Sequence, residues 1–391
     1  MTASLTRATH PFWQAPHRPL FLLAGLWAVA APAVWLLPGG IGGDPVLWHL
    51  HELMFGMGGA AAGGYLLTAL PAWTGRKVSC RATMVFTALW LLSRLGFAAA
   101  GSLPLGLQLV ATLAYFLFLA GFLAWTLLSA GLWSKTWILA PVIGLTAADC
   151  GLLLDPAGLR TGGTLLAAVL AFAFLISGIG GRAVPAFTRH WLERAKIPAR
   201  LRDSQRLSAA AIGTLSAGIC LALSRMDIAA GVCLVASAVL QFVRMAKWRP
   251  RATIRYPALF LLHLAWAWLP AGLLLVGHAL VAPDVIGVAT ALHGLTMGAM
   301  GTMMLAIMGR AAMLRQGERL VLSPTLASAF ALVWLSAPVR IAAGLFPADR
   351  LDPVPVAALL WMAGWALFLK AHLASLRRPI PRPVLSARMR S

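Results

Sequence analysis

Apolar runs of about twenty residues recur along the whole chain, separated by short stretches rich in charged residues, glycine and proline. A run of that length is long enough to cross the hydrocarbon core of a bilayer as an α-helix. The pattern therefore predicts an all-α polytopic membrane protein with twelve transmembrane helices, at residues 19–38, 46–70, 82–100, 104–130, 134–154, 162–184, 207–224, 228–246, 256–277, 284–309, 322–345 and 354–375.

The twelve predicted spans form a single domain over residues 19–375, between an N-terminal segment (1–18) and a basic tail (376–391). The first span reads as an anchor and not as a cleaved signal peptide, because no clear positively charged region precedes it. Of the 32 Lys and Arg residues, 27 fall on the side that holds both termini; the other five are Arg94, Arg160, Arg225, Arg340 and Arg350. The positive-inside rule places that side, and both termini, in the cytoplasm.

The composition excludes a soluble fold, because 60% of the 391 residues are hydrophobic and only 11% are charged. The basic residues that give the net charge of +21 lie between the apolar runs. They therefore indicate how the chain is oriented in the membrane and give no reason to expect a nucleic-acid partner. The four cysteines have no CxxC spacing and suggest neither a disulfide framework nor a zinc site.

Similar short blocks return at intervals of four predicted spans. Span 2 has His51, Gly56 and Gly59 at the spacing of His293, Gly298 and Gly301 in span 10. Span 2 ends in LPAWT (70–74) and span 6 in VPAFT (184–188), and spans 3, 7 and 11 carry Arg94, Arg225 and Arg340 at similar places. These matches favour three four-helix repeats; the alternative is that small apolar residues recur in any membrane protein.

Four of the nine histidines are candidate ligands: His49, His51, His263 and His293. The others, His10, His17, His190, His278 and His372, are expected at the membrane interface. An ionisable side chain inside a membrane is costly unless it has a partner, so a metal or haem site is favoured over helix-to-helix hydrogen bonding.

If the repeat holds, His51 and His293 occupy equivalent places on parallel helices and could bind one haem from opposite faces. The glycines that follow would admit a flat macrocycle, although simple helix packing explains them equally well. Arg94 and Arg340 lie toward the outer side and are predicted partners of the haem propionates, with a buried ion pair as the alternative for each.

His49 and His51 are two residues apart, about 200° around a helix, so a regular helix would not direct both at one metal. Met54, Met57, Met297 and Met300 would suit copper, although methionine is more often a packing residue. Glu52 is expected to orient an imidazole, and a proton carrier is its alternative role.

Several blocks resemble, in order, those of the NnrS family: APHRPLFLLAGLWA (15–28), WHLHELMFG (48–56), LLTALPAWTGR (66–76), GRAVPAFTR (181–189), LLHLAWAWLPAGLLL (261–275) and LHGLTMGAMGTMMLAIMGRAAM (292–313). The resemblance implies a bacterial inner-membrane protein with haem b and, as a further option, copper, linked to nitric oxide resistance. The cofactor-binding residues that the resemblance implies are His49, His51, Glu52, His263 and His293. One departure is Arg315, where family members commonly have a histidine.

The helix count and repeat are also similar, as a fold-level analogy, to the catalytic subunit of haem–copper oxidases. Spans 6 and 7 contain no histidine, so the usual second metal site of those enzymes is missing. The expected function is a haem protein that binds or turns over nitric oxide or a nitrosyl species; an enzyme would be a haem-dependent oxidoreductase with an unknown electron donor. The alternatives are a copper or haem transporter, and an electron-transfer or sensor subunit.

Overall fold

The computed structural model describes residues 10–36, 44–155, 163–198, 201–202, 204–317, 319–345, 352–380 and 384–385. The chain divides into two compact units. Unit 1 holds residues 1–168 and 369–384, and unit 2 holds residues 169–368 and 385–390. The predicted single domain stays a prediction. Arg160, Arg350 and most of the predicted tail lie outside the described residues.

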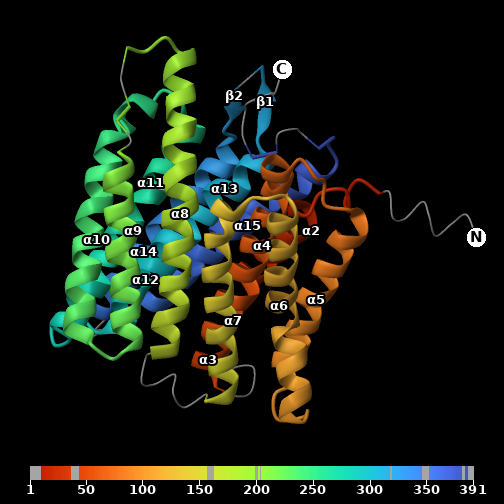
Figure 1. Cartoon of the computed structure of the whole chain (residues 1–391), viewed down its shortest axis with the longest axis vertical. Helices are drawn as coiled ribbons and strands as arrows, with labels where there is room; N and C mark the ends of the chain where they lie inside the picture. The colour runs from red at the N-terminus through yellow and green to blue at the C-terminus, as the bar shows by residue number, and fades with distance from the viewer. Residues whose placement is uncertain are drawn as a thin grey trace, which may run out of the picture. The chain divides into compact units, whose positions relative to one another are not determined.

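Unit 1 is built from helices that Figure 1 colours from red to yellow. They are α2 (His17–Ala30), the 3-10 helix η1 (Ala31–Trp35), α3 (Pro45–His51), the π-helix η2 (Glu52–Met57), α4 (Gly58–Thr74), α5 (Cys80–Ala98), α6 (Leu105–Ser129), the 3-10 helix η3 (Trp133–Ile138) and α7 (Leu139–Leu154). Helix α2 packs on α4, and α6 packs between α5 and α7.

Two helices belong partly to each unit: α8 (Gly163–Arg194) and α15 (Pro353–Leu376). Unit 2 further contains α9 (Gln205–Leu223), α10 (Asp227–Lys247), the 3-10 helix η5 (Pro250–Thr253), α11 (Pro257–Val281), α12 (Val288–His293), the π-helix η6 (Gly294–Gly301), α13 (Thr302–Ala312) and α14 (Pro324–Leu345). Helices α9, α10 and α11 lie side by side (Figure 1).

Local sequence explains where several helices begin and end. The Asp44 carboxylate accepts hydrogen bonds from the first amides of α3, and Pro45 occupies the first helical position, where no amide hydrogen is needed. Ser79 and Ser204 cap α5 and α9 in the same way. Helix α4 ends at Gly75, whose φ of +74° is a left-handed conformation that glycine adopts without steric cost.

In their described residues the twelve predicted apolar runs all form helices, close to the predicted bounds except that the run predicted to end at 184 continues in α8 to Arg194. Within the described residues, ten helices are long and apolar enough to cross a membrane. The two remaining runs are α2 with η1, whose α-helical part has 14 residues, and α5, which carries Arg81 and Arg94. The chain is therefore a multi-pass helical membrane protein, and the count of twelve spans stays a prediction.

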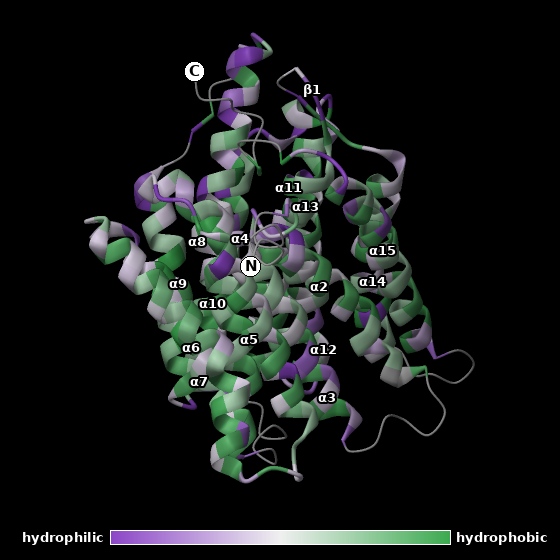
Figure 2. Ribbon diagram, turned by 90° about the vertical axis from the view of Figure 1, so that its right-hand side faces the viewer, coloured by the Kyte–Doolittle hydropathy of each residue, from purple (hydrophilic) through white to green (hydrophobic). Residues whose placement is uncertain are grey.

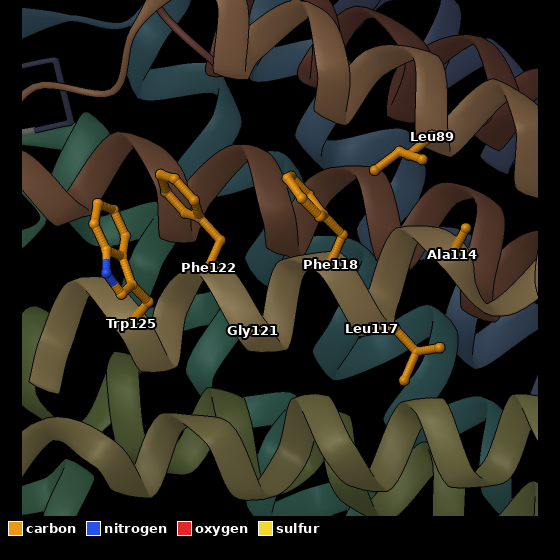
Figure 3. Close-up of a pocket in the computed structure, with 7 residues that line it drawn as sticks. All are labelled: Leu89, Ala114, Leu117, Phe118, Gly121, Phe122 and Trp125. Atoms are coloured by element: carbon orange, nitrogen blue, oxygen red, sulfur yellow. The ribbon is translucent and has the colours of Figure 1, made fainter.

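Hydrophobic residues cover most of the helix surfaces (Figure 2). Helix α6 shows this most clearly, since Val110 is 69% and Trp125 is 65% exposed. The outer faces of α5 and α6 also enclose an open apolar hollow lined by Phe118, Phe122 and Trp125 (Figure 3). Large exposed patches of this kind are rare on soluble proteins and are compatible with lipid contact.

One feature was not expected from the sequence. A short antiparallel hairpin follows α13, formed by β1 (Leu314–Gln316) and β2 (Arg319–Val321). Gly317 lies in its turn with a φ of +57°. Arg315, the residue that departs from the family pattern, is paired with Leu320 in this hairpin.

Candidate functional site

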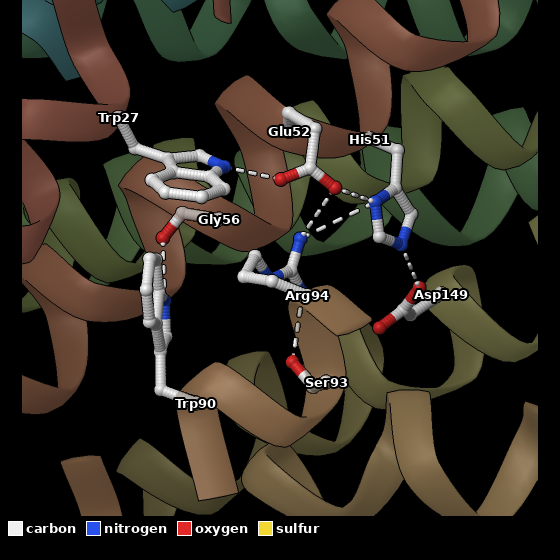
Figure 4. Close-up of polar contacts among 8 residues, drawn as sticks. All are labelled: Trp27, His51, Glu52, Gly56, Trp90, Ser93, Arg94 and Asp149. Carbon is white, nitrogen blue, oxygen red and sulfur yellow. Dashed lines mark hydrogen bonds and ion pairs between the residues drawn. The ribbon is translucent and has the colours of Figure 1, made fainter. Parts of the chain in front are cut away.

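His51 is the last residue of α3 and lies at the centre of a buried polar network in unit 1 (Figure 4). Its Nδ1 is 2.8 Å from Glu52 Oε1, and its Nε2 is 3.0 Å from Asp149 Oδ1. His51 and Asp149 have no exposed surface, and Glu52 is 1% exposed. Both ring nitrogens of His51 are therefore engaged by carboxyl groups.

Arg94 of α5 joins this network from the neighbouring helix. Its Nη1 donates to Glu52 Oε1 at 2.9 Å, and its Nη2 donates to the Ser93 hydroxyl at 2.9 Å. Trp27 of α2 donates its indole N–H to the other oxygen, Glu52 Oε2. The Glu52 carboxylate thus accepts hydrogen bonds from an imidazole, a guanidinium and an indole. These donors take the place of water around it, as an ionised carboxylate requires.

The charges of this network balance. Arg94 compensates Glu52, and the bond between His51 and Asp149 needs a single proton, which makes either an imidazolium–carboxylate pair or a neutral pair. In both cases the buried cluster carries no net charge. Such compensation is what makes ionisable groups tolerable inside a membrane protein.

Asp149 was missed by the sequence analysis. It lies inside the apolar run that forms α7 and is a single acid among small and aliphatic residues. An intramembrane carboxyl group is itself a signal of a functional or paired residue, and that signal could have identified it. Trp27 was missed as well. Its role depends on a contact between α2 and η2 that the sequence does not show.

In unit 2, His293 occupies a local structure like that of His51. Each histidine ends a short α-helix and directly precedes a π-helix, η2 after His51 and η6 after His293. π-helical segments are rare and often occur at functional sites. His293 Nδ1 is 2.7 Å from the Ala289 carbonyl oxygen, so Nδ1 carries the hydrogen. In the neutral ring Nε2 is then unprotonated.

The repeated glycines have corresponding neighbours in the two units. A Cβ on Gly56 would lie 2.5 Å from Trp27 Cδ1, and one on Gly298 would lie 2.6 Å from Trp268 Cδ2. Trp27 belongs to the first predicted span and Trp268 to the ninth, eight spans apart as the repeat requires.

Gly59 and Gly301 show the same relation, against Phe116 of span 4 and Trp361 of span 12. These glycines admit aromatic side chains of neighbouring helices. This agrees with the alternative explanation from the sequence, in which the glycines serve helix packing and not a macrocycle. The repeat itself stays a prediction.

His263 of α11 is buried in unit 2 with one identified partner. Thr188 Oγ1 donates to the Val184 carbonyl at 2.8 Å, so its oxygen accepts the Nε2 hydrogen of His263 at 2.9 Å. His263 Nδ1 is buried without a hydrogen-bond partner. Since burying a charge costs more than burying a neutral ring, Nδ1 presents a lone pair.

Arg340 lies on α14 in unit 2, at the depth of His293. Gly344 faces Thr290 at one end of α14, and Leu326 faces Gly309 at the other, so α14 runs antiparallel to α12 and α13. His293 lies three residues after Thr290, and Arg340 lies four residues before Gly344. Because the helices are antiparallel, both steps lead in the same direction, and the two residues reach a similar level. The predicted propionate role of Arg340 is compatible with this level and stays a prediction, whereas Arg94 lies in unit 1 and pairs with Glu52.

Two of the histidines expected at the membrane interface are buried inside the protein. His17 is 3% exposed and His372 is fully buried, because the first turn of α2 packs against the last turns of α15 within unit 1. His372 Nε2 is 3.1 Å from the Arg18 carbonyl oxygen, and Phe21 contacts both imidazole rings. His10 and His278 are exposed, and His190 is half-buried.

The histidines differ in whether they fit a metal or haem. His263 Nδ1 is buried without a hydrogen-bond partner and His293 Nδ1 donates to the Ala289 carbonyl, whereas both nitrogens of His51 are engaged by carboxyl groups. His49 is half-buried on α3. Because His51 and His293 lie in different units, their pairing stays a prediction. Across the described ranges, no three His, Cys, Asp or Glu side chains are grouped to hold a metal ion, and Met54, Met57 and Met300 are core residues.

The fold and site define a multi-pass helical membrane protein with histidines that directly precede π-helices, His51 fully buried and His293 half-buried. The sequence model of the NnrS family, described as NnrS protein, matches residues 11–379, nearly the whole chain. The chain therefore belongs to the NnrS family, and this membership links it to nitric oxide-related function. No curated protein matches the chain.

Proposed function

We propose that this protein binds haem b through His293 in unit 2 and there binds, or turns over, nitric oxide or a nitrosyl species, contributing to nitric oxide resistance. The observation that carries the proposal is the hydrogen bond from His293 Nδ1 to the Ala289 carbonyl. Histidines that bind metals commonly donate their other ring hydrogen to a carbonyl or carboxylate, which orients the ring.

The residues of unit 2 would perform three tasks. Ala289 holds the His293 ring with Nε2 unprotonated, and the guanidinium of Arg340, at the same depth, supplies a cation for a propionate. The apolar helices around them admit a small apolar molecule that partitions into lipid. When bound, the haem would supply an iron with affinity for nitric oxide.

The setting of the protein belongs to the same proposal. We place the protein in the bacterial inner membrane, and the distribution of Lys and Arg supports an orientation with both termini in the cytoplasm. His293, which lies near the outer end of span 10, would then face the periplasmic side.

A second candidate is copper binding, in a handler or transporter of copper or haem. Its support is the unpartnered Nδ1 of His263. Against it, no three His, Cys, Asp or Glu side chains among the described residues are grouped to hold a metal ion, at His263 or elsewhere. Haem at His293 is therefore the better-supported function.

Haem and metal analysis of the protein purified in detergent tests both candidates. The proposal predicts bound haem and a change of its absorption bands on addition of nitric oxide. Purified protein without haem that cannot be reconstituted with it would overturn the proposal. Copper without haem would favour the second candidate.

A further inference from the structure

We infer that His51 is not an axial ligand of haem or a ligand of copper, but a bridge that joins Glu52 to Asp149 inside unit 1. This inference goes against a symmetric pair of haem ligands at His51 and His293. It deepens the proposed function and rests on it for the role of His293. The geometry of His51 itself is independent of any cofactor.

The hydrogen bonds of His51 leave neither nitrogen for a metal. Nδ1 bonds Glu52 at 2.8 Å and Nε2 bonds Asp149 at 3.0 Å. If the shared proton is on Nε2, that nitrogen has no lone pair to donate. If it is on Asp149, the Nε2 lone pair already accepts it.

The ring is also fixed in its plane by stacking. The ring centroids of His51 and Phe97 are 3.4 Å apart, with an angle of 8° between the planes. Phe97 therefore covers one face of the imidazole, and a rotation of the ring toward another ligand would break this contact as well as both hydrogen bonds.

Releasing Asp149 would leave a buried carboxyl group stranded. Its Oδ2 is buried without a hydrogen-bond partner, so among the described residues His51 supplies the single hydrogen bond of this side chain. Loss of that bond would expose the full cost of burying an unsatisfied polar group. Binding of iron or copper at His51 would have to exceed this cost.

One residue explains why two matched histidines differ. Glu52 follows His51, whereas Gly294 follows His293. The carboxylate holds the His51 Nδ1 hydrogen and draws Arg94 into the network, while His293 turns its Nδ1 hydrogen to the backbone of its own helix. The similar chain patterns therefore hold the two histidines differently, between two carboxyl groups in unit 1 and against a backbone carbonyl in unit 2.

The test compares His51→Gln with the matched change His293→Gln, by haem content and absorption spectrum of the purified proteins. His51→Gln should keep the wild-type haem content and band positions while its thermal midpoint falls. His293→Gln should lose haem or change its bands. Loss of haem, or a change from low-spin to high-spin bands, in His51→Gln would overturn the inference. If His51→Gln does not fold, His51→Asn, which also removes the imidazole, takes its place with the same expected spectrum.

A second measurement needs no haem. Thermal midpoints of His51→Gln, Asp149→Leu and the double variant form a double-mutant cycle in haem-free protein. The bridge predicts that the double variant loses less than the sum of the two single losses, and strict additivity contradicts it. If the wild type binds no haem, the proposed function fails, whereas this cycle still decides the inference about His51.

Discussion

His51 Nε2 lies 3.0 Å from Asp149 Oδ1, although 98 residues separate the two in the chain. This bond ties the end of α3 to the middle of α7 within unit 1. It is the contact that makes a conspicuous sequence motif, two histidines and a glutamate at the start of an apolar run, into part of a neutral buried network.

The buried pair of Glu52 and Arg94 should be a strong determinant of stability. Arg94→Leu removes the compensation of a carboxylate that is 1% exposed, and breaking such a buried pair costs roughly 3–5 kcal/mol. Thermal unfolding in detergent should show a large loss for this variant and a smaller one for the double variant Glu52→Gln with Arg94→Leu. Normal stability combined with loss of haem would instead support the propionate role of Arg94.

The glycine of the unit 2 repeat should tolerate no side chain. A Cβ at position 301 would lie 2.5 Å from Trp361 Cη2, so Gly301→Ala should lower stability by about 1–3 kcal/mol through overpacking. Trp361→Phe in the same chain should restore part of the loss. Gly213→Ala is the control, because nothing lies within 4 Å of its added Cβ. Equal effects at positions 213 and 301 would contradict the packing explanation.

Acid should destabilise the protein partly through His17, which precedes the first predicted span. Burial, aided by His372 and Arg18, lowers the pKa of His17 from 6.5 to about 3. The unfolded chain therefore binds a proton near pH 6.5 and the folded chain near pH 3. The contribution of neutral His17 to the free energy of unfolding is fully present above pH 6.5 and is lost as the pH falls toward 3.

His17→Gln should consequently show a shallower fall of the thermal midpoint between these pH values. The exposed His10 gives the control, since His10→Gln should keep the wild-type slope. An unchanged slope in His17→Gln would show that the acid sensitivity arises elsewhere.

The orientation of the chain can be tested independently of its chemistry. Because 27 of the 32 basic residues fall on one side of the predicted spans, a reporter fused after Ser391 should be active in the cytoplasm. A periplasmic reporter signal would require a different number of spans or the opposite orientation, and it would move the His49 and His51 block to the other face.

The helices could be predicted from sequence because each needs only one local property, an apolar run of sufficient length. The two π-helices could not, since they depend on how η2 and η6 pack on α2 and α11. The hairpin at Leu314–Val321 is polar and short, and no strand pattern indicates it.

The site was partly predictable for a similar reason. His51, Glu52 and Arg94 stand out as ionisable residues in apolar runs, and the buried ion pair was one of the two roles considered for Arg94. The partner of His51 could not be predicted, because nothing in the sequence brings α7 to α3. Likewise, His17 and His372 lie near chain ends, and only the packing of α2 on α15 buries them.

The central claim is that His293 provides the haem ligand of this protein, and complementation by imidazole tests it most directly. His293→Gly should be purified with little haem, and imidazole added during reconstitution should restore haem binding and the wild-type absorption bands, because it replaces the missing side chain. Full haem content and unchanged bands in His293→Gly without imidazole would contradict the claim.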